Sequence, residues 1–234
     1  YAQSKRLGNK RVRKIFMNKK DKIILFDLDG TLIDSTDAIT DTFLHAFSKH
    51  NFDFKGTIED IKVQIGYPLD IMFENLGVDR KIVWDFVDSY KMRYKDISVA
   101  QTLLLENAFE AVTLASKFAR LGVVTTKTRI YSTPILENFD ILKHFEVIIG
   151  REDVENPKPH KEPILKALDA FKYDDKKHQA FMVGDTKLDL ISASNASINS
   201  VGVLCGYSNE EELLKYTNIV KKDSLEAVKH ISLL

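Results

Sequence analysis

Two acidic residues two positions apart, Asp27 and Asp29, follow a short apolar run and are followed in turn by Gly30. Carboxylates so placed can act as a nucleophile and a general acid–base, or as ligands of a metal ion. An Asp-Gly step between apolar runs is also a strong signal for a β-hairpin, so both interpretations stay open on these residues alone. The next apolar run, 31–33, is too short to pair with the first one, which weakens the hairpin interpretation.

Further polar residues stand at the ends of later apolar runs. Thr125 and Thr126 end the second run, Lys158 follows the third, and Asp185 ends the fourth. Asp189 comes one helical turn after Asp185. If the runs are parallel strands, ligands bind in the crevice beyond their carboxyl ends. We therefore expect these carboxylates, hydroxyls and this ammonium group to lie together in one site.

Carboxylates gathered in this way need a counter-charge. Two unit charges about 4 Å apart repel by about 4 kcal/mol at an effective dielectric constant of about 20. A Mg²⁺ ion removes that repulsion, and proteins usually hold it with one or two carboxylates, water and a phosphate oxygen. A threonine and a lysine facing the ion would bind the other oxygens of a phosphoryl group. The residues thus predict Mg²⁺ as the cofactor of phosphoryl chemistry, for which a covalent aspartyl-phosphate is a recognised route.

The elements that position these residues are predicted by five apolar runs, at 22–28, 122–126, 145–150, 179–185 and 200–206. Each run is continuous rather than alternating. Continuous hydrophobicity is typical of strands that are buried on both faces of a parallel sheet. The runs therefore predict a parallel sheet of at least these strands.

Helical patterns separate the last four runs. One pattern ends in a glycine C-cap at Gly122, and a second begins with Thr133 as N-cap and Pro134 at the first helical position. Two more cover 162–171 and 187–196. Strands that alternate with helices in this way are typical of a doubly wound α/β domain.

The interval 35–102 breaks this alternation, because it contains no convincing strand-like run. It has the pattern of four helices, at 38–50, 58–65, 70–76 and 81–94. A crossover between parallel strands needs only about a dozen residues. The sequence therefore predicts a helical module inserted directly after the acidic turn.

These patterns divide the chain into a core at 20–34 and 103–234 and a helical cap at 35–102. We expect 1–19 to be a basic tail outside the fold, because 1–20 contain eight Lys or Arg and no acid. The remainder, with 26 basic and 34 acidic residues, carries a net charge of −8. An acidic body argues against a nucleic-acid-binding surface.

Other features limit the compartment and the class of protein. No apolar run reaches the roughly 18 residues of a transmembrane helix, so we expect no membrane partner. The one cysteine, Cys205, excludes a disulfide framework and a cysteine zinc site, and it fits a reducing compartment such as the cytoplasm. We interpret Cys205 as a small core residue. Nothing in the sequence indicates the oligomeric state.

Four segments, "DLDGTLIDS", "VVTTK", "NPKPHKEP" and "VGDTKLD", resemble in order and spacing the four motifs of the haloacid dehalogenase-like hydrolase superfamily. The resemblance covers essentially 22–234. It implies a Rossmann-like parallel-sheet core with a helical cap inserted after the first strand, which agrees with the module at 35–102.

The resemblance also implies roles for the site residues. Asp27 would be the nucleophile that takes the phosphoryl group, and Asp29 would be the general acid and then the base. Thr125 and Lys158 would hold the phosphoryl group during transfer. Mg²⁺ would bind the Asp27 carboxylate, the Asp29 carbonyl and Asp185.

Further residues would support this group. Asp189 would assist the metal ligands, and Gly30 would form the turn that lets backbone amides approach phosphate. Thr126, and Gly66 and Tyr67 in the cap segment "IGYPLD", would face the substrate.

Departures from the superfamily pattern narrow the activity. Dehalogenases of the superfamily have an aromatic residue where this chain has Asp29, so dehalogenation is not expected. The segment "GDTKLDL" is more similar to the phosphatases than to β-phosphoglucomutase-like members, and "TTK" followed by Arg129 is similar to a bacterial pyrophosphatase. We expect a Mg²⁺-dependent phosphatase for a small phosphorylated metabolite, first phosphoglycolate and next pyrophosphate. A phosphomutase and a non-enzymatic phosphoacceptor module are the remaining alternatives.

Overall fold

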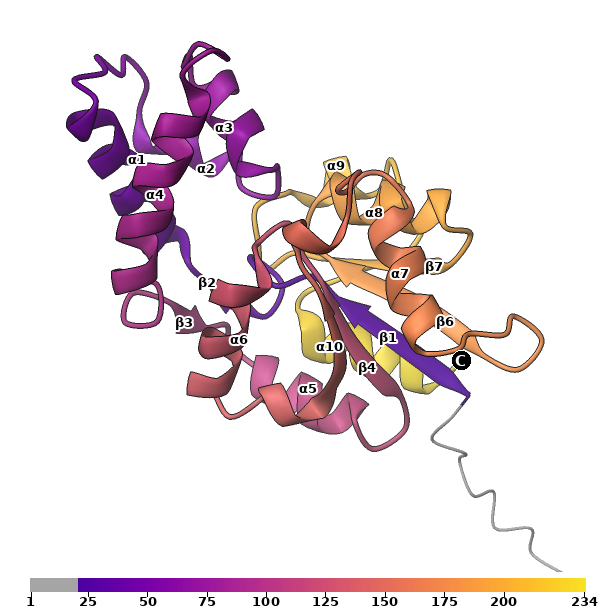
Figure 1. The fold of residues 1–234 in the computed structure, drawn as a ribbon. Helices are drawn as coiled ribbons and strands as arrows, with labels where there is room; N and C mark the ends of the chain where they lie inside the picture. The colour runs from indigo at the N-terminus through magenta and orange to yellow at the C-terminus, as the bar shows by residue number, and fades with distance from the viewer. Residues whose placement is uncertain (1–20) are drawn as a thin grey trace, which may run out of the picture.

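The computed structural model describes residues 21–234, and Figure 1 shows a twisted sheet flanked by helices with a separate group of helices beyond one end. The predicted basic tail at 1–19 lies outside the described residues. The sheet has six strands in the order β5–β4–β1–β6–β7–β8, and every neighbouring pair is parallel. The strands are β1 Lys22–Phe26, β4 Arg120–Val124, β5 Phe145–Ile149, β6 Gln179–Gly184, β7 Asn199–Val203 and β8 Val220–Lys221.

The strand order places β1 beside β6, although the two strands are far apart in the sequence. From β1 the chain builds outward through β4 and β5 on one side and then returns to build β6, β7 and β8 on the other. Such a reversal is the topological switch point at which α/β sheets bind their ligands. Asp27 and Asp185 follow the two strands that meet there.

Both faces of the sheet are covered by helices. Ile24 and Phe26 pack into the apolar cluster on one face, and Ile23 and Leu25 pack into the cluster on the other. The first face is covered by α5 Ala108–Ala115, α6 Arg129–Asn138 and α10 Ser224–Ser232, and the second by α7 Glu162–Ala170 and α8 Lys187–Asn195. Burial of both faces explains why the strands are continuously apolar. The predicted Rossmann-like parallel core is confirmed.

Two predicted helix ends are wrong. The helix α5 ends at Ala115, and Gly122 lies inside β4 rather than at a helix C-cap. In the sequence, the helix, the turn and the strand that follows form one continuous apolar pattern, which hides the end of the helix. The helix α6 begins after Thr128, so Pro134 lies in its interior and Thr133 is not an N-cap. Pro134 is on the exposed side of the helix, where water can replace the hydrogen bond that proline cannot make.

Four of the five helices between β1 and β4 form the cap, which is the violet group at the upper left of Figure 1. They are α1 Thr36–Lys49, α2 Ile58–Lys62, α3 Leu69–Asn75 and α4 Val83–Ile97, each within a few residues of its predicted range. Their apolar cluster is separate from those of the sheet and centres on the buried rings of Phe43, Phe47, Phe73 and Phe86.

Two short strands join the cap to the sheet region. β2 Ile33–Asp34 and β3 Leu103–Leu104 pair antiparallel where the chain enters and leaves the cap. Neither strand was predicted from the sequence, and nor was β8, because two residues carry no readable periodicity. The short helix α9 Glu210–Leu213 completes the described elements with two single-turn 3-10 helices. Among residues 21–234, no helix has the length and hydropathy needed to cross a membrane.

Candidate active site

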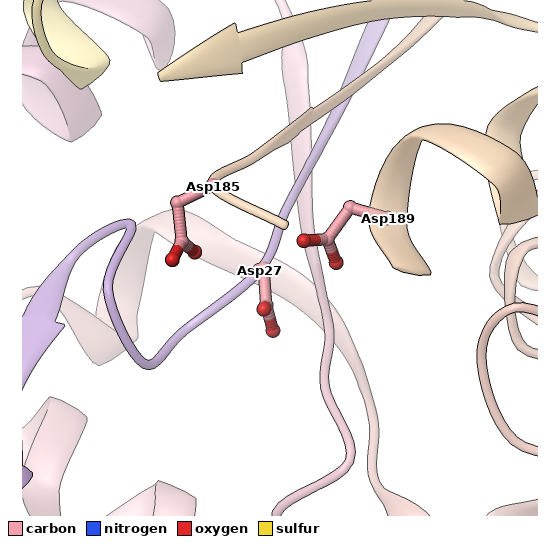
Figure 2. A group of neighbouring side chains, drawn as sticks. All are labelled: Asp27, Asp185 and Asp189. Carbon is pink, nitrogen blue, oxygen red and sulfur yellow. The ribbon is translucent and has the colours of Figure 1, made fainter. Parts of the chain in front are cut away.

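Three buried carboxylates meet at the switch point. Figure 2 shows the neighbouring side chains of Asp27 beyond β1, Asp185 beyond β6 and Asp189 in the first turn of α8. One oxygen from each carboxylate lies within 4.8 Å of the others. The side chains of all three are almost inaccessible to solvent. The structure thus brings together the three acids that the sequence predicted at the strand ends.

Lys158 supplies the positive charge that faces these acids. Its Nζ lies 2.8 Å from Asp27 Oδ1 and 2.6 Å from Asp189 Oδ1, and it donates a hydrogen bond to the carbonyl of Val124 at 3.1 Å. Burial alone would lower the pKa of Lys158, but the Asp189 and Asp27 carboxylates raise it above the ordinary value. All three ammonium hydrogens of Lys158 thus have protein partners. One of these partners is Asp27, the predicted nucleophile.

The charge in this cluster does not balance. Burial, and then the neighbouring carboxylate of Asp189, raise the pKa of Asp27 well above its ordinary value. The same causes raise the pKa of Asp185 to about 7. Three buried carboxylates thus face one ammonium group, and burial together with their mutual repulsion disfavours their charged forms. Oxygen donors that lack a counter-charge are suited to a hard divalent cation, and so these residues fit the predicted metal ion.

Asp185 is oriented by two loops. Its Oδ1 accepts a hydrogen bond of 2.8 Å from the hydroxyl of Thr31, and its Oδ2 accepts one of 2.9 Å from the backbone N–H of Tyr207. The loop after β7 therefore contributes to the site, although the sequence around Cys205 gave no such signal. Cys205 is half-buried against the core, and burial raises the pKa of its thiol to about 12.

Asp29 lies in a tight turn that leads into the cap and is not the tip of a hairpin. Gly30 has a φ of +77°, and its N–H donates to the carbonyl of Ile33 at 2.8 Å. Only glycine adopts this backbone conformation readily, which agrees with the predicted turn. The Oδ1 of Asp29 accepts a hydrogen bond from Ser35 Oγ and lies 3.2 Å from Lys127 Nζ.

The two predicted threonines follow β4 and differ in their contacts. Thr125 is buried, and its hydroxyl accepts a hydrogen bond of 3.1 Å from the N–H of Lys127. The hydroxyl of Thr126 donates to the carbonyl of Gly66 in the cap at 3.0 Å. Gly66, Tyr67 and Thr126 line one cavity together with Asp29. The predicted substrate-facing residues thus lie around one space between cap and core.

Lys127 was not among the predicted site residues. Its Nζ donates to the hydroxyl of Tyr94 at 2.6 Å and also pairs with Asp29, so it joins helix α4 of the cap to the acidic turn. In the sequence, the only feature that pointed to a role for Lys127 was its position directly after the threonine pair. The contact with Tyr94 depends on how the cap docks, which local patterns do not indicate.

The haloacid dehalogenase-like hydrolase family model matches residues 24–203. Pyrophosphatase PpaX of Anoxybacillus flavithermus is 35% identical over 194 residues, which are 82% of this chain and 88% of that protein. Pyrophosphatase PpaX of Bacillus pumilus is 33% identical over 198 residues, with the same coverage.

Solved structures agree with this family. The structure of a predicted phosphatase from Clostridium acetobutylicum superposes with a TM-score of 0.82 at 26% identity and covers 92% of this chain and 99% of its own. A haloacid dehalogenase-like family hydrolase from Streptococcus pneumoniae gives a TM-score of 0.80 at 25% identity, covering 91% of this chain and 99% of its own. The chain therefore belongs to the haloacid dehalogenase-like hydrolase family and is one of its phosphatases.

Proposed function

We propose that this phosphatase is Mg²⁺-dependent and hydrolyses a small phosphorylated compound through a phosphoryl group carried on Asp27. The observation that carries the proposal is the buried cluster of Asp27, Asp185 and Asp189, which faces the ammonium group of Lys158. A carboxylate in such a cluster becomes an effective nucleophile once a cation compensates its neighbours.

The chemistry takes two steps. An oxygen of the Asp27 carboxylate attacks phosphorus, the bond from phosphorus to the leaving oxygen breaks, and Asp29 gives that oxygen a proton. In the second step a water molecule attacks phosphorus, Asp29 takes its proton, and the bond to Asp27 breaks to release phosphate. Lys158 Nζ, which lies 2.8 Å from Asp27 Oδ1, orients this carboxylate. Asp29 thus serves as the general acid in the first step and as the general base in the second.

The residues that would hold the cation are the Asp27 and Asp185 carboxylates and the carbonyl of Asp29, with Asp189 in support. A bound divalent cation supplies charge that neutralises these carboxylates and polarises the phosphoryl oxygens. Thr31 and the N–H of Tyr207 hold Asp185 in place for this role. Partners of this kind typically change metal affinity or activity by about 10–100-fold when they are disturbed.

Mg²⁺ should stabilise the protein more at about pH 8 than at about pH 5. The pKa of Asp185 is raised to about 7 from an ordinary value of 3.8, so the folded state favours its neutral form. That contribution to stability is complete below about pH 4 and is lost as the pH rises through about 7. At saturating Mg²⁺ near pH 8 we expect a rise in Tm of about 5–10 °C. Thermal scans with Mg²⁺ and with EDTA measure it, and an equal rise at both pH values would contradict the prediction.

Gly206→Ala should raise the Mg²⁺ concentration needed for half-maximal activity by about 10–100-fold. An added Cβ would lie 2.1 Å from Asp185 Oδ2 and 2.5 Å from the carbonyl of Gly30, so Asp185 would have to move. The matched control is Gly202→Ala in β7, whose Cβ would meet only side-chain atoms, the nearest at 3.2 Å. Titration of activity with Mg²⁺ compares the two variants. Identical titration curves would show that the Asp185 carboxylate does not depend on this close approach.

The cap is docked over the site in this structure. Its contacts with the core include those of Thr126 with the Gly66 carbonyl, Lys127 with the Tyr94 hydroxyl, and the Tyr131 hydroxyl with the Lys91 carbonyl at 3.1 Å. A closed cap keeps bulk water away from the phosphorylated aspartate and places the leaving group against cap residues. The cap therefore governs which compounds enter the site.

Two substrates follow from the sequence motifs and the relatives. Phosphoglycolate is the first expectation from the motifs, and inorganic pyrophosphate is favoured by the names of the two PpaX relatives. A phosphomutase would use the same intermediate but would return the phosphoryl group to product and need a bisphosphate activator. We expect the enzyme to act in the cytoplasm, because a chain with one cysteine fits a reducing compartment.

Release of inorganic phosphate tests the proposal. Phosphoglycolate, pyrophosphate and sugar phosphates are each supplied with Mg²⁺ and with EDTA. We expect turnover on at least one substrate that EDTA abolishes and added Mg²⁺ restores. Turnover that persists unchanged in EDTA would refute the metal requirement, whereas stoichiometric labelling of the protein without turnover would favour a phosphoacceptor module.

A further inference from the structure

A cavity of about 260 Å³ lies between cap and core and reaches Asp29. In the proposed function Asp29 protonates the leaving oxygen, so the rest of the leaving group must extend into this space. The cavity volume approaches the lower end of the range of small-molecule sites, about 300 Å³. Glycolate and phosphate would each fill only a part of it. The residues that line the cavity therefore indicate which kind of leaving group it accepts.

The cap side of the cavity is mainly apolar. Ile65, Met72 and Val87 contribute buried aliphatic or thioether surface from three parts of the cap. Trp84, in the first turn of α4, also lines the cavity, yet it is 58% exposed. A large aromatic ring that faces a cavity and is left half uncovered offers contact area that an apolar group could bury. Apolar surface of this kind gives no favourable interaction to a charged leaving group.

Tyrosine side chains line the cavity beside its charged groups. Tyr94 Oη accepts from Lys127, and Tyr131 Oη donates to the carbonyl of Lys91. Tyr90 lines the same cavity, and its ring stacks on that of Tyr94 with a centroid distance of 5.3 Å. Tyr90 is almost fully buried.

Equal numbers of acidic and basic side chains line the cavity. Three acidic residues, Asp29, Asp70 and Glu152, face three basic ones. Of the basic residues, Lys127 is paired with Asp29 at 3.2 Å, and Arg151 donates to the carbonyl of Val154 at 2.9 Å. A second phosphate or a glycolate carboxylate would need an excess of positive charge in this space, since complementary potential governs charged partners. With Asp29 ionised, the three acidic and three basic side chains leave the cavity wall without a formal net charge.

The geometry points to an uncharged leaving group with an aromatic or similarly apolar body. The substrate would then be the phosphate monoester of an apolar alcohol, with its phosphoryl group at Asp27 and its apolar body against Trp84 and Val87. This inference rests on the proposed function, because it takes Asp29 to mark the leaving oxygen. The inferred substrate differs from the two expected above, phosphoglycolate and pyrophosphate.

Benzyl phosphate and ethyl phosphate test the inference, because both are alkyl esters and differ mainly in the apolar ring. We expect kcat/KM for benzyl phosphate to exceed that for ethyl phosphate, phosphoglycolate and pyrophosphate by about tenfold or more. Trp84→Ala should reduce the benzyl-to-ethyl ratio several-fold. Met92→Ala is the matched control, because Met92 lies on the same helix, is 62% exposed and does not line the cavity.

The outcomes separate the two proposals. A benzyl-to-ethyl ratio near one, or faster hydrolysis of phosphoglycolate or pyrophosphate, would overturn the inference. If that hydrolysis required Mg²⁺ and Asp27, the proposed function would still stand. Absence of Asp27-dependent hydrolysis for every compound would overturn both. An equal loss of the ratio in Trp84→Ala and Met92→Ala would also overturn the assignment of this cavity.

Discussion

Asp27→Asn should lower Mg²⁺-dependent phosphate release by about 10⁴-fold or more, a loss typical of removing a covalent nucleophile. The amide has nearly the same shape as the carboxylate and can still accept a hydrogen bond from Lys158. It cannot form the covalent bond to phosphorus that the proposed first step requires. The loss should therefore appear in kcat with little change in the fold.

Stability provides an internal check on this variant. Asp27 is buried beside Asp189 and Asp185, and its pKa is raised by burial and by these neighbours. The charged form of this carboxylate is disfavoured, so replacing it by a neutral amide should leave the free energy of unfolding in EDTA unchanged or higher. Asp37→Asn, at an exposed position in the first turn of α1, is the control that should keep full activity. Comparable phosphate release by Asp27→Asn and wild type would exclude Asp27 as the nucleophile.

Lys158→Met should lower the free energy of unfolding in EDTA by about 3–5 kcal/mol and should also abolish turnover. The side chain of Lys158 is almost fully buried, and its ammonium group lies within 2.8 Å of both Asp27 and Asp189. Methionine fills a similar volume but leaves the carboxylates without the ammonium group that pairs with them. Leaving a buried charge unpaired costs more than the pair itself contributes.

A double variant distinguishes the loss of charge balance from a simple packing defect. Lys158→Met with Asp189→Asn removes one stranded charge, while the amide oxygen can still accept from the N–H of Thr186 as Asp189 Oδ2 does at 3.0 Å. We expect it to recover part of the lost stability but none of the activity. Urea unfolding and phosphate release measure the two properties separately. Equal stability of the single and double variants would contradict the electrostatic explanation.

The core could be predicted because its strands are buried on both faces and because parallel strands present their carboxyl ends at one edge. Ile23 and Ile24 face opposite helical layers, and so the run is apolar without alternation. That pattern, with the rule for strand ends, was enough to place Asp27, Asp185 and Lys158 near one another. The pairing order of the strands, which the structure shows, completes the site because it makes β1 and β6 neighbours in the sheet.

The parts that could not be predicted depend on contacts between distant segments. The N–H of Tyr207 reaches Asp185 only because β7 ends beside β6, and a backbone donor has no side-chain signature. The contact of Lys127 with Tyr94 requires the cap to dock in one orientation. The start of α6 was misplaced because Pro134 normally marks a first turn, whereas an exposed interior position also tolerates it.

The central claim is that the phosphoryl group passes through a covalent bond to Asp27. Rapid acid quench of the enzyme with radiolabelled p-nitrophenyl phosphate and Mg²⁺, followed by digestion and peptide mapping, tests it directly. The account predicts acid-stable label on the peptide that contains Asp27, absent in Asp27→Asn and lost on a chase with unlabelled substrate. Steady turnover with no label on the protein, or label on a different residue, would contradict it.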